Sequence, residues 1–416
     1  MNIATAHTTD SRYAAWRLAI AVLIMTLGAA GMYVVPVALP AVQADFGVAR
    51  GQAALPFSLL MIGFGFGGLV MGRLADRHGV IVPLVIGGTC LGIGFISAAF
   101  APNLLAFNAI HGLLIGFAGS SATFSPLVAD TSLWWVKRRG IAVAICASGN
   151  YIGGAVWPPI INAGIEAFGW RRTYMGLGAA CGVAIVALAL FMRERPPQQG
   201  SAANKAAIHR DHERPFGLAI GTALVLLMVA GLACCVAMSM PQVHIVAYCG
   251  DLGYGAARGA EMLSVMMAFG VVSRLASGWL SDHIGGLRTL MVGSALQGVA
   301  LFLFLPFDGL VSLYVISALF GLFQGGIVPS YAIIVREHFP ASEAGARVGA
   351  IIMFTLVGMA LGGWMSGKIF DLTGSYHAAF VNGLTWNALN LSIVYFLLRR
   401  TRVPAGTSQA RAAPLR

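Results

Sequence analysis

One charged side chain lies where charge is rarely tolerated, and its chemistry suggests a role. Arg274 follows seven uncharged residues, 267–273, and no further charge occurs until Asp282. A guanidinium in such an apolar segment is costly unless it faces water or a partner. Its planar fork of donors fits a carboxylate through two parallel hydrogen bonds. We therefore expect Arg274 to bind an anionic ligand. The alternative is a permanent ion pair with a carboxylate of another segment, for which Asp130 is the main candidate.

Four polar side chains occur near the middle of other apolar segments: Tyr33, Asn150, Gln324 and Tyr331. Buried amides and phenols need hydrogen-bond partners, so each side chain could contact either a ligand or a neighbouring segment. We predict that all four contribute to the site of Arg274. For Asn150 and Gln324, a bond to a neighbouring segment is an equal alternative.

Three ionisable residues are candidates for carrying a proton: His111, His244 and Glu261. Histidine changes its charge near neutral pH, so either histidine could couple proton movement to ligand movement. The alternative for both is a neutral ring that is bonded to a backbone carbonyl or lies in an outer vestibule. For Glu261, the alternative is a solvated helix end.

The elements that position these residues are membrane-spanning helices. Of the 416 residues, 58% are hydrophobic and 10% are charged, and the mean hydropathy is +0.81. Runs of about 20 apolar residues recur, which is the length that crosses ~30 Å of hydrocarbon as a helix. A β-barrel would show alternating segments of about 10 residues instead. We predict an all-α membrane protein with twelve transmembrane helices in two six-helix bundles.

The predicted spans are 16–39, 53–75, 81–100, 104–134, 140–168, 173–192, 216–248, 259–281, 287–306, 310–336, 346–370 and 378–398. They divide the chain into an N-terminal segment (1–15), a first bundle (16–192), a hydrophilic linker (193–215), a second bundle (216–398) and a basic tail (399–416).

The basic residues predict the orientation of the chain. Twenty of the 26 Lys and Arg residues fall on the side of the termini, and five fall on the other side: Arg50, Arg171, Arg172, Arg258 and Lys368. Basic loops stay in the cytoplasm, so both termini are expected there, in an inner (cytoplasmic) membrane. The net charge of +11 follows from this asymmetry, and we expect no nucleic-acid partner.

Two motifs indicate an internal duplication. The pattern Gly-x-Leu-x-Asp-x-x-Gly begins at Gly72 and again at Gly278, 206 residues later. Four glycines of 140–168, namely Gly140, Gly149, Gly153 and Gly154, reappear 209 residues later as Gly349, Gly358, Gly362 and Gly363. Glycines at this spacing let two helices approach closely, and their matched positions support two related halves.

The first motif, GRLADRHG, together with twelve spans and a central hydrophilic linker, resembles the major facilitator superfamily. Smaller features, such as WWVKRRG at 134–140, GWR at 169–171 and DLTGSY at 371–376, resemble its monocarboxylate-transporter-like branch, which includes oxalate/formate exchangers. One turn before Arg274, where that branch usually has an acid, this chain has Gly270. Oxalate exchangers also carry a lysine inside the penultimate span, which is 346–370 in this chain. Here that lysine is absent, because Lys368 lies near the outer end of the span.

The resemblance implies roles for several residues. Asp76, Arg77 and Asp282 match the loop motif that stabilises one conformation in this superfamily. We expect Asp130 to join this latch by pairing with Arg73 or Arg77, and a role in proton transfer is the alternative. The first, fourth, seventh and tenth helices line the cavity in the resembled fold, which favours Tyr33 and Tyr331 as cavity residues.

Catalysis and metal chemistry find no support in the sequence. No nucleophile–base pair and no Walker motif occurs, and the six cysteines lack the spacing of metal ligands. We therefore expect no cofactor and no bound metal. The predicted function is secondary transport of a small monocarboxylate with a proton, by a monomer. The alternatives are anion exchange of the oxalate/formate type, proton-driven export of cationic or apolar compounds, and a non-transporting receptor of the same fold.

Overall fold

The computed structural model describes residues 8–195, 215–340 and 344–401, and every regular element in these ranges is a helix. Twelve helical stretches are long and apolar enough to cross a membrane, as predicted. In a bilayer a helix satisfies its own backbone hydrogen bonds, which is why apolar runs of this length fold in this way. Most of the predicted linker, the first seven residues and the tail from residue 402 lie outside the described residues.

In the first half the helices are α1 (Arg12–Gly28), α2 (Ala30–Phe46), α3 (Arg50–His78), α4 (Ile81–Ala99), α5 (Leu104–Ile110), the π-helix η1 (His111–Gly119), the 3-10 helix η2 (Ser120–Thr123), α6 (Ser125–Trp134), α7 (Arg139–Phe168), α8 (Trp170–Ala189) and the short η3 (Leu190–Met192). The second half contains η4 (Pro215–Gly217), α9 (Ile220–Asp251), α10 (Ala256–Ile284), α11 (Gly286–Leu303), α12 (Leu310–Gln324), α13 (Ile327–His338), α14 (Ala344–Thr373) and α15 (Tyr376–Thr401).

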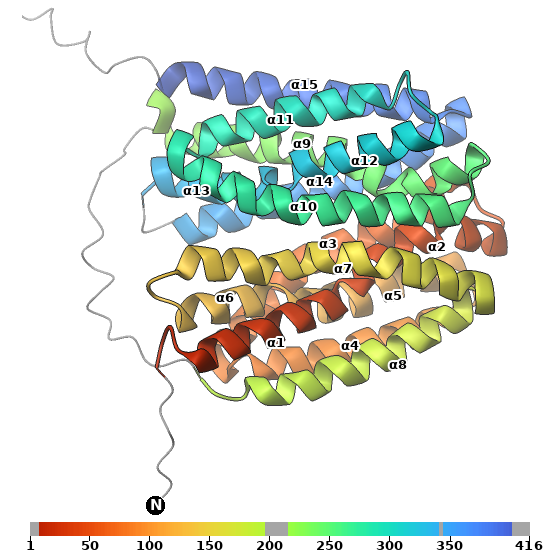
Figure 1. Ribbon diagram of the computed structural model, residues 1–416, viewed down its shortest axis with the longest axis horizontal. Helices are drawn as coiled ribbons and strands as arrows, with labels where there is room; N and C mark the ends of the chain where they lie inside the picture. Colours follow the sequence, from red (N-terminus) through yellow and green to blue (C-terminus); the bar gives the residue numbers. More distant parts are fainter. Residues whose placement is uncertain (1–7, 196–214, 341–343, 402–416) are drawn as a thin grey trace, which may run out of the picture.

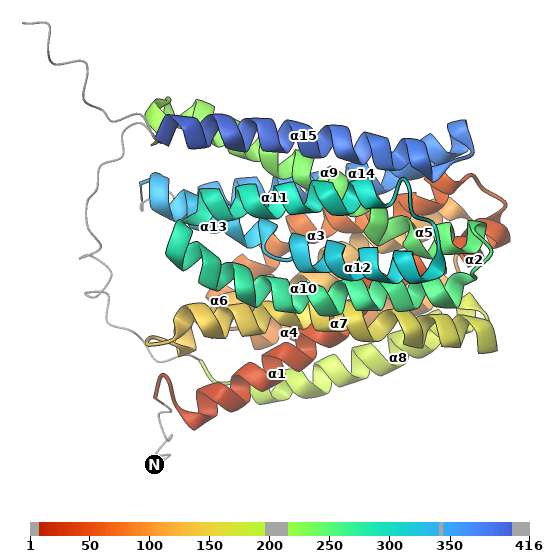
Figure 2. The same ribbon diagram turned by 45° about the horizontal axis from the view of Figure 1, so that its top comes forward.

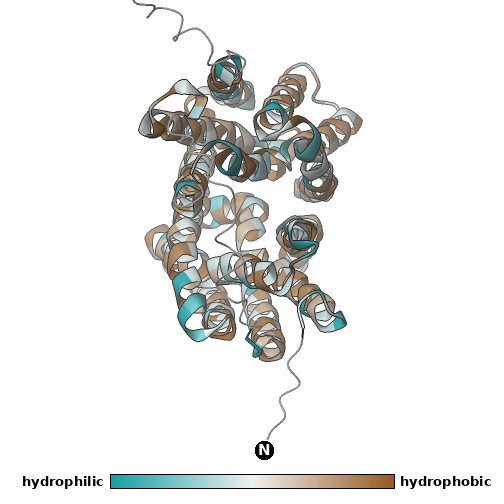
Figure 3. Cartoon of the chain, turned by 90° about the vertical axis from the view of Figure 1, so that its left-hand side faces the viewer, coloured by the Kyte–Doolittle hydropathy of each residue, from teal (hydrophilic) through white to brown (hydrophobic). Residues whose placement is uncertain are grey.

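The helices run side by side along the long axis of the molecule, with α1–α8 in one group and α9–α15 in the other (Figures 1 and 2). We call the end at which α1 begins and α15 finishes the terminus side, and the other end the opposite side. The two halves meet where α3 packs against α14 and α7 packs against α10. Viewed from the terminus side, apolar residues cover the flanks of both groups (Figure 3). Exposed side chains such as Phe66, Val183 and Val311 suit a lipid-facing surface.

Three spans are interrupted, which the sequence analysis did not predict. The first span divides at Ala29 and continues to Phe46, where Gly47 in the left-handed conformation (φ 62°) ends it. The fourth changes from α-helix to π-helix to 3-10 helix between His111 and Thr123. The tenth breaks at Gly325 and Gly326, between α12 and α13. Two of these breaks lie beside residues that the sequence analysis singled out, His111 and Gln324.

The repeated glycines perform the same task in both halves. In α7, Gly149 and Gly153 lie against Val22 and Thr26 of α1, so that any larger side chain would meet the α1 backbone. In α14, Gly358 and Gly362 lie in the same way against Leu232 and Val236 of α9. The last glycines of the two loop motifs, Gly79 and Gly285, also match, since they end α3 and α10 with φ values of 86° and 82°. This equivalence agrees with a duplicated fold.

Candidate functional site

Arg274 lies on α10 at the interface between the two halves. Its Nη1 donates a hydrogen bond of 3.0 Å to the carbonyl of Ala147 on α7. The guanidinium carbon is 4.5 Å from the centre of the Tyr151 ring, which is cation–π distance. The Nε atom is buried and has no hydrogen-bond partner among the described residues. The buried Nε of Arg274 therefore has a hydrogen to donate and no acceptor among the described residues.

The permanent ion pair that was the alternative for Arg274 is not formed with Asp130. The described residues show no carboxylate within ion-pair distance of Arg274. Its contacts are a carbonyl oxygen and an aromatic face, and neither neutralises its charge.

Tyr33 and Asn150, two of the predicted residues, meet beside Arg274. The Tyr33 hydroxyl donates to Asn150 Oδ1 at 3.3 Å and lies 3.2 Å from the sulfur of Met267 on α10. Tyr33 and Tyr151 are both close enough to interact electrostatically with Arg274. Residues from α2, α7 and α10 thus converge on one point between the halves.

Tyr151 was missed by the sequence analysis, although it follows Asn150 directly in the chain. The structure explains its place through Gly270, which lies one turn before Arg274. A side chain at 270 would collide with the Tyr151 ring. The absence of an acid at this position therefore makes room for the aromatic ring that covers Arg274.

Gln324 is fully buried at the end of α12, where the tenth span breaks. Gln242 of α9 donates to its Oε1 at 2.9 Å, while Nε2 of Gln324 has no partner among the described residues. The next residue, Gly325, packs against Gly270 and Ser273 of α10. Gln324 is therefore a second buried donor without an acceptor, next to the segment of α10 that carries Arg274.

Tyr331, the fourth predicted polar residue, lies elsewhere. Its hydroxyl contacts Asn390 Oδ1 at 3.4 Å and the sulfur of Cys234 at 3.6 Å, and the side chain is 1% exposed. It packs in the apolar core of the second half, among α9, α13 and α15. The structure does not bring it together with Tyr33 and Asn150.

The three candidate proton carriers have different surroundings. His111 is buried inside the first half, where its ring nitrogens contact the carbonyl of Phe107 (2.8 Å) and the Tyr174 hydroxyl (3.3 Å). Glu261 is exposed near the start of α10, paired with Arg258 at 2.9 Å and bonded to Tyr314. His244 is buried on α9, between α14 and α15, close to the opposite side.

The prediction that Asp130 pairs with Arg73 or Arg77 is wrong. Asp130 forms a two-point ion pair with Arg17 of α1, with Oδ2 3.0 Å from Nε and Oδ1 3.0 Å from Nη2. Arg17 and Asp130 face each other because α1 and α6 pack together in the first half, whereas Arg73 and Arg77 are exposed at the end of α3. This pair joins two helices of one half and is not a link between halves.

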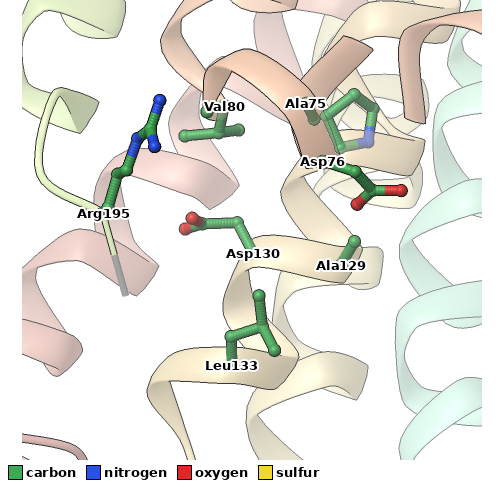
Figure 4. A pocket seen from close by; sticks show the side chains of 9 residues that line it. Ala75, Asp76, Val80, Ala129, Asp130, Leu133 and Arg195 are labelled. Carbon is green, nitrogen blue, oxygen red and sulfur yellow. The ribbon is translucent and has the colours of Figure 1, made fainter. Parts of the chain in front are cut away.

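The other residues of the predicted latch lie at the terminus side. Asp76 and Arg77 are exposed at the end of α3, and Asp282 is exposed at the end of α10. Asp76, Asp130 and Arg195 line a pocket of about 240 Å³. Figure 4 shows Asp130 pointing toward the side of this pocket on which Arg195 stands, whereas Asp76 points away. The latch role of Asp76, Arg77 and Asp282 stays a prediction.

Comparisons with known proteins agree with this architecture. A family model described as Major Facilitator Superfamily matches residues 21–313 and 262–415. Monocarboxylate transporter 13 of Bos taurus is 29% identical over 324 residues, which cover 76% of this chain and 73% of that protein. The uncharacterized MFS-type transporter YcxA of Bacillus subtilis is 27% identical over 336 residues, covering 79% and 81%. A solved structure of a mutant of the nucleoside transporter NupG gives a TM-score of 0.73 at 14% identity, over 93% of this chain and 99% of that one, which shows the fold alone.

Proposed function

Because this chain belongs to the Major Facilitator Superfamily, we propose that it carries a small monocarboxylate across the membrane and that Arg274 binds the carboxylate. That it is a transporter and not an enzyme follows from the family and from its transporter relatives. Relatives named monocarboxylate transporters favour an anionic substrate. The observation that carries the proposal is the buried Nε of Arg274, which has no acceptor among the described residues, at the interface of the halves.

The proposed site combines one cation with neutral donors. Arg274 would give the carboxylate two parallel hydrogen bonds from Nε and Nη2, while its Nη1 keeps the carbonyl of Ala147. Tyr33 and Tyr151 would wall the site, and Nε2 of Gln324 offers a further donor from the second half. A single cation suits a monoanion, whereas a dianion would require a second positive charge. Near the middle of the membrane, between two halves that rock, such a site can face each side in turn.

Orientation follows from the basic residues. We place the terminus side in the cytoplasm, because 20 of the 26 Lys and Arg residues belong to it. The hydrogen bonds that join Ser264 to Ala155 and Ser58 to Ala360 lie between the middle and the opposite side. The salt bridge from Arg50 to Asp251 lies at that side itself. We interpret this arrangement as a state closed to the outside. We also propose that the protein is a monomer in the cytoplasmic membrane.

Proton coupling is favoured by the energetics of the substrate. A carboxylate that enters against a negative-inside potential is opposed by ~2.3 kcal/mol per 100 mV. One proton moving with it removes this cost. Export of cations, the alternative that requires an acidic cavity residue, is disfavoured because Asp130 is already paired with Arg17 and Glu261 is exposed.

The test is uptake of labelled pyruvate or lactate into proteoliposomes, with and without an inward proton gradient. Uptake that follows the gradient and is blocked by other monocarboxylates supports the proposal. Uptake that requires internal anion and ignores the gradient would identify an exchanger instead. Absence of uptake for every carboxylate tested, from protein that is shown to be folded, would remove the anion proposal.

A further inference from the structure

At the opposite side, one arginine ties the two halves together. Arg50, the first residue of α3, reaches Asp251 at the end of α9 through two hydrogen bonds, of which Nη2–Oδ1 measures 3.2 Å. Its Nη1 also donates to the Tyr376 hydroxyl at 3.1 Å. The backbone amides of Arg50 and Gly51 each donate to the carboxylate of Asp371 at 2.8 Å. We call Arg50, Asp251, Asp371 and Tyr376 the outer clamp, since they hold the start of α3 against α9, α14 and α15.

A buried histidine contacts this clamp through Tyr376. His244 is fully buried, with Nε2 2.7 Å from the carbonyl oxygen of Gly363 and Nδ1 3.0 Å from the Tyr376 hydroxyl. A carbonyl oxygen only accepts hydrogen bonds, so Nε2 must carry the hydrogen. In a neutral ring Nδ1 is then an acceptor, and it takes the hydroxyl hydrogen of Tyr376. The chain of donors therefore runs in one direction, from Arg50 to Tyr376, to His244, to Gly363.

Protonation of His244 is incompatible with this order of donors and acceptors. A charged imidazole donates from both nitrogens, so Tyr376 could no longer donate to Nδ1. Its oxygen would face two donors, from His244 and from Arg50, and its own hydrogen would lose its partner. A second positive charge would also be added close to the Arg50 guanidinium. Both effects weaken the contact between Tyr376 and Arg50, which crosses from one half to the other.

Other ionisable groups lie near the His244 ring. Arg50 of α3 and Asp371 of α14 act on His244 electrostatically, one against and one in favour of its positive charge, while Tyr376 contacts it from α15. On α9 itself Tyr248 lies one turn away, with its ring 5.5 Å from that of Tyr376. The charged residues at this end of α10 and α2, which also pack against α9, are paired elsewhere: Arg258 with Glu261, and Asp45 with Arg171.

From this geometry we infer that His244 is the proton-sensing residue of the outer clamp, and that its protonation favours opening toward the outside. His244 takes the proton from the outer solution when the halves part. It must release that proton before the chain from Arg50 to Gly363 can form again. Coupling of this kind is reciprocal, so the closed state excludes the proton as strongly as the proton opposes closure. The biological purpose of this response rests on the proposed transport. The response itself does not, because closure of the outer clamp can be measured without any substrate.

The experiment measures the distance between spin labels in the substrate-free, full-length protein. Labels are attached at Ala44→Cys on α2 and Thr373→Cys on α14, both exposed at the opposite side. The half-buried Cys90 is replaced by alanine. Between pH 7.5 and pH 5.5, the ratio of open to closed distances should rise at least about fivefold. His244→Gln, whose amide can donate to Gly363 and accept from Tyr376, should reduce that change to less than about twofold.

Two further variants separate His244 from its neighbours. Tyr376→Phe removes the linking hydroxyl, keeps the salt bridge, and should reduce the pH response to the part that charge repulsion between His244 and Arg50 supplies. Asp251→Asn should open the clamp at both pH values and keep the response, because His244 is intact. A response of wild-type size in either His244→Gln or Tyr376→Phe, whichever of them folds, overturns the inference. A response that disappears only in Asp251→Asn would show that the carboxylate is the sensor. Failure of carboxylate uptake would leave these distances unaffected, so the two proposals can fail separately.

Discussion

Asp130 and Arg17 form an ion pair inside the first half, with exposed fractions of only 7% and 2%. Arg17 also donates to the carbonyl of Met192 at 3.2 Å, and its guanidinium lies 5.0 Å from the centre of the Trp134 ring. The pair therefore joins α1, α6 and the end of the last span of this half. Two buried charges held in this way require each other, because either one alone would lie desolvated.

Asp130→Asn should destabilise the protein strongly. Removal of one partner from a buried pair leaves the other charge uncompensated, at a cost of about 3–5 kcal/mol. Unfolding of the purified protein in detergent, followed by heat or denaturant, measures this loss. Asp76→Asn is the matched control, because Asp76 lines the same pocket but is exposed, and it should change stability by less than about 0.5 kcal/mol. Equal effects of the two substitutions would contradict a structural role for the pair.

Arg274→Gln should abolish carboxylate transport and leave the substrate-free protein stable. Among the described residues the side chain has no carboxylate partner to lose, and its hydrogen bond to Ala147 is worth about 1 kcal/mol. Loss of a charged contact to the substrate should reduce uptake at least about 30-fold. Arg274→Lys keeps the charge but not the planar fork, so its uptake should lie between that of the wild type and that of Arg274→Gln. A large drop in the melting temperature of Arg274→Gln, measured without substrate, would instead assign Arg274 a structural role.

Gln324→Leu should raise the KM for the carboxylate about tenfold, because it removes a buried donor that can bind a charged group. Gln242→Leu is the control. It breaks the same hydrogen bond between the two glutamines but leaves Nε2 of Gln324 in place. Gln242→Leu should therefore lower stability to a similar extent while KM stays within about twofold. The same increase in KM for both variants would indicate that Gln324 only supports the packing.

Tyr33 and Tyr331 were both predicted to lie at the site of Arg274, but in the structure only Tyr33 lies there. Tyr33→Phe should reduce transport several-fold, because its hydroxyl joins Asn150 of one half to Met267 of the other beside Arg274. Tyr331→Phe should leave KM unchanged and cost about 1 kcal/mol of stability, through loss of its contact with Asn390. Uptake kinetics and unfolding of both variants check this contrast. A change of KM in Tyr331→Phe would restore the role that the resemblance implied.

The apolar runs and the duplicated motifs were sufficient to predict twelve spans in two halves, because hydrocarbon allows few other structures. Arg274 could be singled out from the sequence because a charge inside an apolar run is costly in hydrocarbon. The partner of Asp130 was not, since sequence does not reveal which faces of α1, α3 and α6 meet. Tyr151 was missed because an aromatic residue in a span usually packs against lipid or core. The outer clamp joins residues 201 to 326 positions apart, and only the packed halves bring them together.

Gly270→Ala should impair transport although it adds a single methyl group. Its new carbon would collide with the Tyr151 ring and push that ring off Arg274. Overpacking of this kind costs roughly 1–3 kcal/mol, and the displaced ring would disturb the proposed site. Gly176→Ala, inside α8, is the matched control, because its added carbon would meet nothing within 4 Å. It should leave uptake unchanged and favour the helix slightly. Uptake by Gly270→Ala equal to that of Gly176→Ala would mean that the position of Tyr151 does not matter for transport.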